Sequence, residues 1–125
     1  MPELKVTGHK GALAFYIDGS LQFDTRDEAV YHETLALPAA ALAAARFRRP
    51  LRALVLGGGD GLALRELLQF PQVASADLVD YDPGVLELGR GAFAAYNRGS
   101  LSDARVKVHC GDDIVLADFT FPADL

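Results

Sequence analysis

A glycine-rich segment that contains an acid is the part of this chain whose residues could most clearly do chemistry. An apolar run at 53–56 leads directly into Gly57-Gly-Gly-Asp-Gly61. Glycines at a turn between a strand and a helix let the backbone approach a ligand closely, as in nucleotide-binding loops. A loop that binds phosphate would avoid a carboxylate facing its anion. Asp60 therefore favours a ligand with a positive centre, such as a sulfonium or an ammonium, and favours S-adenosyl compounds over dinucleotides.

Further acids follow the next two apolar runs. Asp80 closes the run at 76–79, and Asp112-Asp113 follow the run at 105–109. A carboxylate in the place of Asp80 can accept two hydrogen bonds from a ribose diol, and an acid at Asp112 can accept one from an adenine amino group or cap the next helix. Asp82 precedes Pro83 and is expected to cap a helix there. Because ligands of open α/β sheets bind at the carboxyl ends of the strands, these acids and the glycine loop predict one nucleoside site.

The elements that must position these residues alternate along the chain. Strands are predicted at 53–56, 76–80 and 105–109, with helices at 62–70 and 84–96 between them, which indicates a parallel sheet with right-handed crossovers. Residues 4–24 alternate like an antiparallel unit with a turn at Asp18-Gly19. Thr25 and Glu28 form a capping-box pattern for a helix that reaches Pro38 and continues or restarts beyond it.

The fold class is therefore α/β, a small antiparallel β unit at 1–25 followed by an incomplete Rossmann-like sheet at 26–125, of the type found in S-adenosylmethionine-dependent transferases. The predicted fourth strand would begin near Asp124, after a short helix at 114–119. An open sheet of three strands leaves an unpaired edge and an apolar surface, so we expect self-association.

Composition limits the classes of function. The chain has 125 residues, a formal net charge of -5 and a single cysteine, so it has the size of one domain and no internal disulfide. The acidic balance disfavours nucleic acid as a partner and suits a cationic substrate. The absence of a signal-like or membrane-length apolar run predicts a cytoplasmic location and no membrane contact for this segment. The three histidines lack metal-ligand spacing, so no metal site is predicted. Cys110 is expected to be buried in its strand.

Four segments in order resemble the polyamine aminopropyltransferases, which are the spermidine and spermine synthases. They are YIDGSLQF at 16–23, RDEAVYHE at 26–33, VLGGGDG at 55–61 and VDYDP at 79–83. The first two are especially similar to the bacterial spermidine-synthase-like branch, whose longer members often carry membrane segments ahead of this domain. The resemblance covers nearly the whole chain, and it implies assembly as a homo-oligomer, a dimer or tetramer.

The resemblance implies a co-substrate, decarboxylated S-adenosylmethionine, an acceptor polyamine such as putrescine, and methylthioadenosine as the product. The implied cofactor-binding residues are Gln22, Gly57, Gly58, Gly59, Asp60, Gly61, Asp80, Asp112 and Asp113. Within this set Gln22 lies near the methionine-derived end, Asp60 binds the aminopropyl ammonium, Asp80 binds the ribose and Asp112 binds the adenine. Tyr31 and His32, together with Asp60, are implied to line the amine pocket, and many members have glutamine in place of His32.

The family's catalytic aspartate follows the fourth parallel strand, and Ala123-Asp124-Leu125 resemble the beginning of that strand. No catalytic residue is therefore predicted within this chain, and we expect no measurable aminopropyl transfer from it alone. Two alternatives stay open at this point. One is a methyltransferase that uses S-adenosylmethionine itself, and the other is a non-catalytic nucleoside-binding or interaction module that pairs through its sheet edge.

Overall fold

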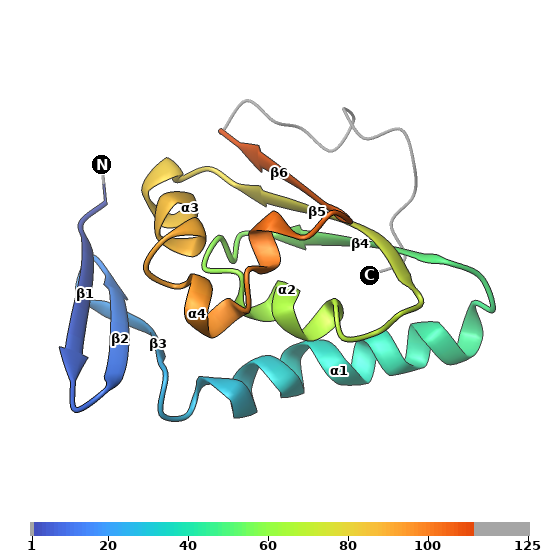
Figure 1. Ribbon diagram of the computed structural model, residues 1–125, viewed down its shortest axis with the longest axis horizontal. Coiled ribbons are helices and arrows are strands. Elements are labelled where there is room, and N and C mark those ends of the chain that lie inside the picture. Colours follow the sequence, from blue (N-terminus) through green and yellow to red (C-terminus); the bar gives the residue numbers. More distant parts are fainter. Residues whose placement is uncertain (1, 112–125) are drawn as a thin grey trace.

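Two three-stranded sheets organise residues 2–111, the part of the chain that the computed structural model describes (Figure 1). The first sheet is antiparallel, with β1 at Leu4–His9, β2 at Ala12–Ile17 and β3 at Ser20–Asp24 in that order. Asp18 and Gly19 both have positive φ, 49° and 79°, between β2 and β3. Two such residues are what a tight hairpin turn with the right-handed twist of the strands requires.

The second sheet is parallel, as the alternating pattern predicts. It contains β4 at Leu51–Leu56, β5 at Val73–Asp80 and β6 at Val106–Cys110, in the order β4-β5-β6. Leu56 is opposite Val79, and Asp80 is opposite Cys110, so the carboxyl ends of all three strands lie at one edge. The residues that follow each strand are thereby brought to the same edge of the sheet.

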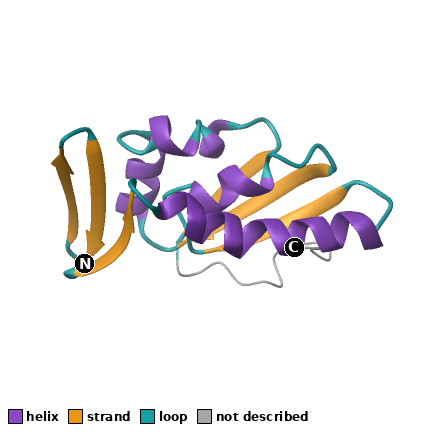
Figure 2. Ribbon diagram, turned by 90° about the horizontal axis from the view of Figure 1, so that it is seen from below, coloured by secondary structure: helices purple, strands orange, loops and turns teal. Residues whose placement is uncertain are grey.

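Within residues 2–111, four α-helices and a short 3-10 helix accompany the parallel sheet. They are α1 at Glu28–Arg46, α2 at Leu62–Leu67, α3 at Pro83–Arg90, α4 at Ala94–Asn97 and η1 at Ser100–Ser102. Figure 2 shows α1 beside the parallel strands and the antiparallel sheet at one end of the molecule. None of the helices within residues 2–111 has the length and apolar character needed to cross a bilayer.

Alanines allow α1 to pack closely on the rest of the fold. Ala36, Ala40 and Ala43 are buried and belong to one cluster with side chains from α2, β4 and β5. Because these side chains are small, the backbone of α1 can lie close to the strands and to α2, and the helix becomes part of the core. They fix the position of α1 relative to the strand that leads into the glycine loop.

Three phenylalanines join the antiparallel sheet to the helices. Phe15 and Phe23 of that sheet lie with their ring centroids 5.0 Å from the ring of Phe93, which precedes α4. Both contacts are edge-on, the arrangement that aromatic quadrupoles favour. Because Leu62 and Val85 belong to the same buried cluster, the hairpin is held against the start of α2 and α3, where the glycine loop ends.

The start of α1 differs from the sequence prediction. The capping box of Thr25 and Glu28 is wrong, because the residue that precedes the helix is Asp27, with no side-chain capping bond. The Thr25 hydroxyl oxygen instead accepts a hydrogen bond from the Leu13 amide at 2.9 Å, which ties it to β2. Pro38 does not interrupt the helix, because it lies on the exposed side, where the carbonyl that loses its partner can meet water.

Two other predictions need correction. The predicted helix at 84–96 is divided, because α3 ends at Arg90 and Gly91 adopts φ -109° and ψ -99° before α4 begins. Cys110 is exposed rather than buried, since it is the last residue of an edge strand. The elements predicted at 114–119 and near Asp124 lie outside the described residues, and the division at residue 25 stays a prediction.

Candidate functional site

A cavity of about 160 Å³ lies where the glycine loop, the end of β5 and the antiparallel sheet meet. We call it the glycine-loop cavity. It contains most of the site residues predicted from the sequence, and its lining consists of Phe15, Ile17, Gln22, Gly57, Gly58, Gly59, Asp60, Asp80, Tyr81, Asp82 and Val85. Polar groups therefore come from three separate parts of the chain, and apolar walls come from the hairpin and α3.

The glycine loop needs its glycines for two reasons. Gly57, Gly58 and Gly61 adopt positive φ values of 78°, 69° and 80°, which side chains other than glycine rarely tolerate. At Gly59 the reason is space, because an added Cβ would lie 2.8 Å from Asp80 Oδ2. The loop can thus approach the end of β5 closely enough to be bound by it.

Asp80 binds the loop to the beginning of α3. It is buried, its Oδ2 accepts a hydrogen bond from the Gly59 amide at 2.9 Å, and its Oδ1 accepts one from the Asp82 amide at 2.9 Å. An ionised carboxylate has about four acceptor positions, so two such bonds leave capacity for a ribose diol. Asp82 in turn accepts from the Gly84 amide at 2.9 Å, which confirms the predicted helix cap.

Asp60 presents a destabilised negative charge to the same cavity. Burial raises the pKa of its carboxyl, although the Leu62 amide donates to its Oδ1 at 3.0 Å and opposes this shift. His32 lowers the pKa of Asp60, while Asp80 and Glu28 raise it. A cation that enters the cavity would therefore find a carboxylate whose charge the protein only partly balances.

A buried amide that sequence reasoning missed supports the loop from behind. Asn97 has no exposed surface, and its Nδ2 donates to the Asp60 and Gly89 carbonyls, each at 2.8 Å. The Ser100 hydroxyl donates to the Gly61 carbonyl at 2.8 Å. No periodic pattern distinguishes an asparagine of this kind from a surface residue, so the sequence carried no signal for it.

Tyr31 and His32 do not line the glycine-loop cavity. Tyr31 is 63% exposed on α1, and its ring lies edge-on to the buried His32 ring at 5.0 Å. Although it lies outside this lining, His32 lowers the pKa of the Asp60 carboxyl. Asp112 and Asp113, the predicted adenine-side acids, lie outside the described residues, so the cavity as described has the ribose and aminopropyl side of the predicted site.

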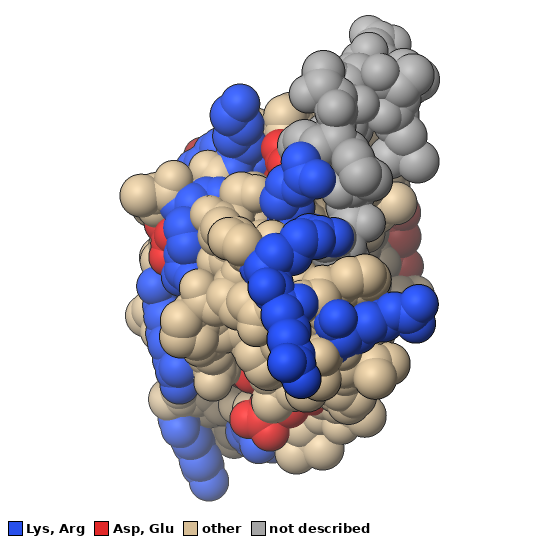
Figure 3. All heavy atoms as spheres, turned by 90° about the vertical axis from the view of Figure 1, so that its right-hand side faces the viewer, with Lys and Arg blue, Asp and Glu red and all other residues tan. Residues whose placement is uncertain are grey.

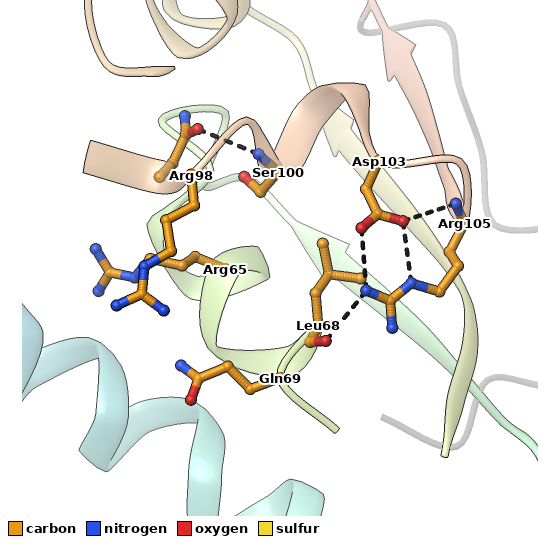
Figure 4. A pocket seen from close by; sticks show the side chains of 8 residues that line it. Arg65, Leu68, Gln69, Arg98, Ser100, Asp103 and Arg105 are labelled. Atoms are coloured by element: carbon orange, nitrogen blue, oxygen red, sulfur yellow. Dashed lines mark hydrogen bonds and ion pairs between the residues drawn. The ribbon is translucent and has the colours of Figure 1, made fainter. Parts of the chain in front are cut away.

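A second cavity, shown in Figure 4, has mostly polar lining residues, and several of them are paired with one another or with neighbouring groups. Arg105 pairs with Asp103 at 3.0 Å and donates to the Leu68 carbonyl at 3.1 Å. Arg65 reaches it from α2 while it is bound to Glu28. The bond from Arg105 fastens the segment before β6 to the end of α2, and the bond from Arg65 joins α2 to α1. Both are structural roles.

Basic side chains gather on the face at which α1 ends (Figure 3). Arg46 and Arg49 both lie over the ring of Phe47, at 5.6 and 5.0 Å from its centroid. The chain therefore has a locally positive surface although its formal net charge is -5. That it has no nucleic-acid partner stays a prediction. Among residues 2–111, no group of three His, Cys, Asp or Glu side chains is placed to hold a metal ion.

Comparisons with known proteins agree on one family. Residues 28–120 match the model of the spermine/spermidine synthase domain. Polyamine aminopropyltransferase 2 of Ralstonia nicotianae is 45% identical over 135 residues, which cover 97% of this chain and 26% of that protein. Polyamine aminopropyltransferase of Mycobacterium tuberculosis is 46% identical over 110 residues, which cover 88% of this chain and 20% of that protein.

Solved structures give the same result for the fold. The crystal structure of spermidine synthase from Thermotoga maritima matches with a TM-score of 0.77 and 29% identity, over 90% of this chain and 38% of that one. A spermidine synthase in complex with the transition state analogue AdoDATO matches with a TM-score of 0.76 and 29% identity, over 88% of this chain and 36% of that one. The chain spans between a fifth and about a quarter of the length of the curated relatives named above. It belongs to the spermine/spermidine synthase domain family.

Proposed function

We propose that the glycine-loop cavity is the decarboxylated S-adenosylmethionine half of a spermidine-synthase-like aminopropyltransferase site. The observation that carries the proposal is the meeting of Gln22, the glycine loop, Asp60 and Asp80 around one cavity. In this proposal Asp80 accepts hydrogen bonds from the ribose hydroxyls, and the loop lies against the nucleoside. Gln22 faces the methionine-derived end, and Tyr31 and His32 act at its edge.

The proposed reaction transfers an aminopropyl group to a polyamine such as putrescine. A neutral amine nitrogen attacks the methylene carbon next to the sulfonium, the C–S bond breaks, and its electron pair stays on sulfur. The products are a substituted amine, which loses a proton, and methylthioadenosine. We assign no base to any described residue. Asp60 contributes by holding the ammonium of the aminopropyl group, which positions the reacting carbon.

The charge of Asp60 separates this function from methyl transfer. S-adenosylmethionine carries a carboxylate at the end where its decarboxylated form has only an ammonium. A carboxylate beside Asp60 would place two negative charges together in a cavity where burial already disfavours one. The same site should therefore prefer the decarboxylated ligand.

The test is to measure the affinities of the purified chain for both ligands by calorimetry. We expect decarboxylated S-adenosylmethionine to bind more tightly, and Asp60→Asn to remove the preference. Asp27→Asn, which removes an exposed acid before α1, should leave it unchanged. Tighter binding of S-adenosylmethionine would support a methyltransferase, and no binding of either would support an interaction module.

Self-association and a cytoplasmic location complete the proposal. Large apolar side chains are exposed along α1 and at the end of β4, namely Val30 at 70%, Leu35 at 56%, Leu42 at 71% and Leu56 at 64%. Exposed apolar patches often mark contacts between chains. Light scattering should give a mass above that of one chain as concentration rises, and a monomer at all concentrations would contradict this.

A further inference from the structure

Two buried side chains hold the carbonyl groups of the glycine loop from behind. Asn97 Nδ2 donates to the Asp60 carbonyl, and the Ser100 hydroxyl donates to the Gly61 carbonyl, each at 2.8 Å. Asn97 is 0% exposed and Ser100 is 3% exposed, and neither belongs to the lining of the glycine-loop cavity. The directions of two successive carbonyl groups are therefore fixed by residues that do not face the ligand.

A planar trans peptide transmits the direction of its carbonyl to the next amide. The C=O and the N–H of one such peptide point in opposite directions, so a carbonyl fixed on one side fixes the N–H on the other. The Leu62 N–H shares a peptide with the Gly61 carbonyl, and it donates to Asp60 Oδ1 at 3.0 Å. The Gly61 N–H shares a peptide with the Asp60 carbonyl, and it donates to the Gly58 carbonyl at 3.0 Å. A chain of hydrogen bonds thus runs from Ser100 through one peptide to the Asp60 carboxylate.

Two glycines leave room for these contacts. A Cβ on Gly61 would lie 2.5 Å from Ser100 Oγ and 2.7 Å from Asn97 Nδ2, and a Cβ on Gly89 would lie 2.1 Å from the Gly59 carbonyl oxygen. Asn97 Nδ2 also donates to the Gly89 carbonyl at 2.8 Å, and its Oδ1 accepts from the Ser100 amide at 3.2 Å. Both N–H groups of the Asn97 amide are thus used within the protein, so Asn97 has no donor left for a ligand.

We infer that Ser100 and Asn97 are positioning residues that aim the Asp60 carboxylate at the ammonium end of the ligand. They fix the two peptides on either side of Gly61, so that the Leu62 amide holds Asp60 Oδ1 and Oδ2 is directed to the ammonium. Without the Ser100 hydroxyl, the peptide between Gly61 and Leu62 can turn, and the carboxylate loses its fixed direction. The inference rests on the proposed function, because it requires a ligand that carries an ammonium.

The first measurement is an NMR titration of the Asp60 carboxyl in the full chain, and it needs no ligand. Burial raises the pKa of this carboxyl, and the hydrogen bond from the Leu62 amide lowers it. Ser100→Ala should loosen that bond, so the midpoint should rise above that of the unmodified chain. Ser102→Ala, which removes an exposed hydroxyl from the same 3-10 helix, should leave the midpoint unchanged. Both variants keep the other groups that act on this carboxyl, namely His32, Asp80 and Glu28. A midpoint in Ser100→Ala that is unchanged or lower would overturn the inference.

The second measurement isolates the ammonium contact. The ratio of affinities for decarboxylated S-adenosylmethionine and methylthioadenosine reports the aminopropyl group, because the nucleoside is common to both. Ser100→Ala and Asn97→Ala should each lower this ratio about tenfold, the lower end of what a hydrogen bond to a charged group contributes. Ser100→Thr should retain most of the ratio, since threonine keeps the hydroxyl that holds the Gly61 carbonyl.

The controls separate damage to the fold from loss of the contact. Val73→Ala removes buried apolar volume at the beginning of β5, the end of that strand away from the glycine loop. It should lower stability and leave both the ratio and the midpoint of Asp60 unchanged. A ratio for Ser100→Ala equal to that of the unmodified chain would overturn the inference. If the unmodified chain bound neither ligand, the proposed function would fail, and the titration of Asp60 would still decide whether Ser100 positions its carboxylate.

Discussion

Replacing Asp80 with asparagine should destabilise the fold far more than its small change in shape suggests. The carboxylate accepts from two backbone amides through different oxygens, Gly59 at Oδ2 and Asp82 at Oδ1, each at 2.9 Å. Asparagine has one acceptor oxygen and one amide donor. Whichever way it turns, its NH₂ group faces one of the two backbone N–H groups, so one buried donor loses its partner.

The magnitude follows from that one lost bond. A hydrogen bond to a charged group is worth about 1.5–3 kcal/mol, and an unpaired buried donor costs about 1–3 kcal/mol, two descriptions of largely the same loss. We therefore expect Asp80→Asn to lower the free energy of unfolding by about 1.5–3 kcal/mol. That is a large part of the roughly 5–15 kcal/mol that stabilises an ordinary domain.

The assay is urea unfolding followed by circular dichroism, with Asp82→Asn as the matched control. Among residues 2–111, Asp82 accepts a hydrogen bond through Oδ1 from the Gly84 amide, and asparagine caps helices about as well as aspartate. The control should thus lose less than about 0.5 kcal/mol. Equal midpoints for the two variants would refute the role given to Asp80 as the bond between the loop and α3.

Two further predictions concern the loop's neighbour and the hairpin. An added Cβ at Gly89 would lie 2.1 Å from the Gly59 carbonyl oxygen, so Gly89→Ala should lower the free energy of unfolding in urea by about 1–3 kcal/mol. In the control Gly8→Ala, the added Cβ has only a backbone oxygen at 3.8 Å, so the loss should be less than about 0.5 kcal/mol. Equal losses for the two variants would contradict the close packing at Gly89. Hydrogen bonds from Arg26 lower the pKa of Asp24 from 3.8 to about 2, so an NMR titration should give a midpoint near 2 that moves toward 3.8 in Arg26→Gln. Because the pKa of Asp24 is lower in the folded state, the stability that this pair contributes is present above pH 3.8 and is lost as the pH falls to about 2. A titration midpoint of 3.8 for Asp24 in the unmodified chain would exclude the interaction.

The parts of the fold that local rules control were predictable from the sequence. Gly57 and Gly61 mark a turn that only positive φ can form, and Pro83 after Asp82 marks a helix start, so the strand–loop–helix order followed. Thr25 shows the limit of such rules. Its hydroxyl had a tertiary partner in Leu13, which outcompeted the local cap.

The supports of the site could not be predicted, because they join residues far apart in sequence. Arg65 and Glu28 are separated by 37 positions, and so are Asn97 and Asp60. Arg65, Glu28 and Asn97 each look like an ordinary polar residue of a surface helix until the fold brings its partner to it. Sequence patterns therefore found the groups proposed to touch the ligand and missed those that hold them in place.

The central claim is that the glycine-loop cavity binds the nucleoside, and amide chemical-shift mapping with methylthioadenosine tests it most directly. The account predicts that the amides of Gly58, Gly59 and Asp82, which lie in or beside the lining, shift together with one saturation curve. Amides of the far end of α1, such as Ala43 in the buried helix core, should stay unchanged. Saturable shifts confined to other residues, with the loop unaffected, would contradict the account.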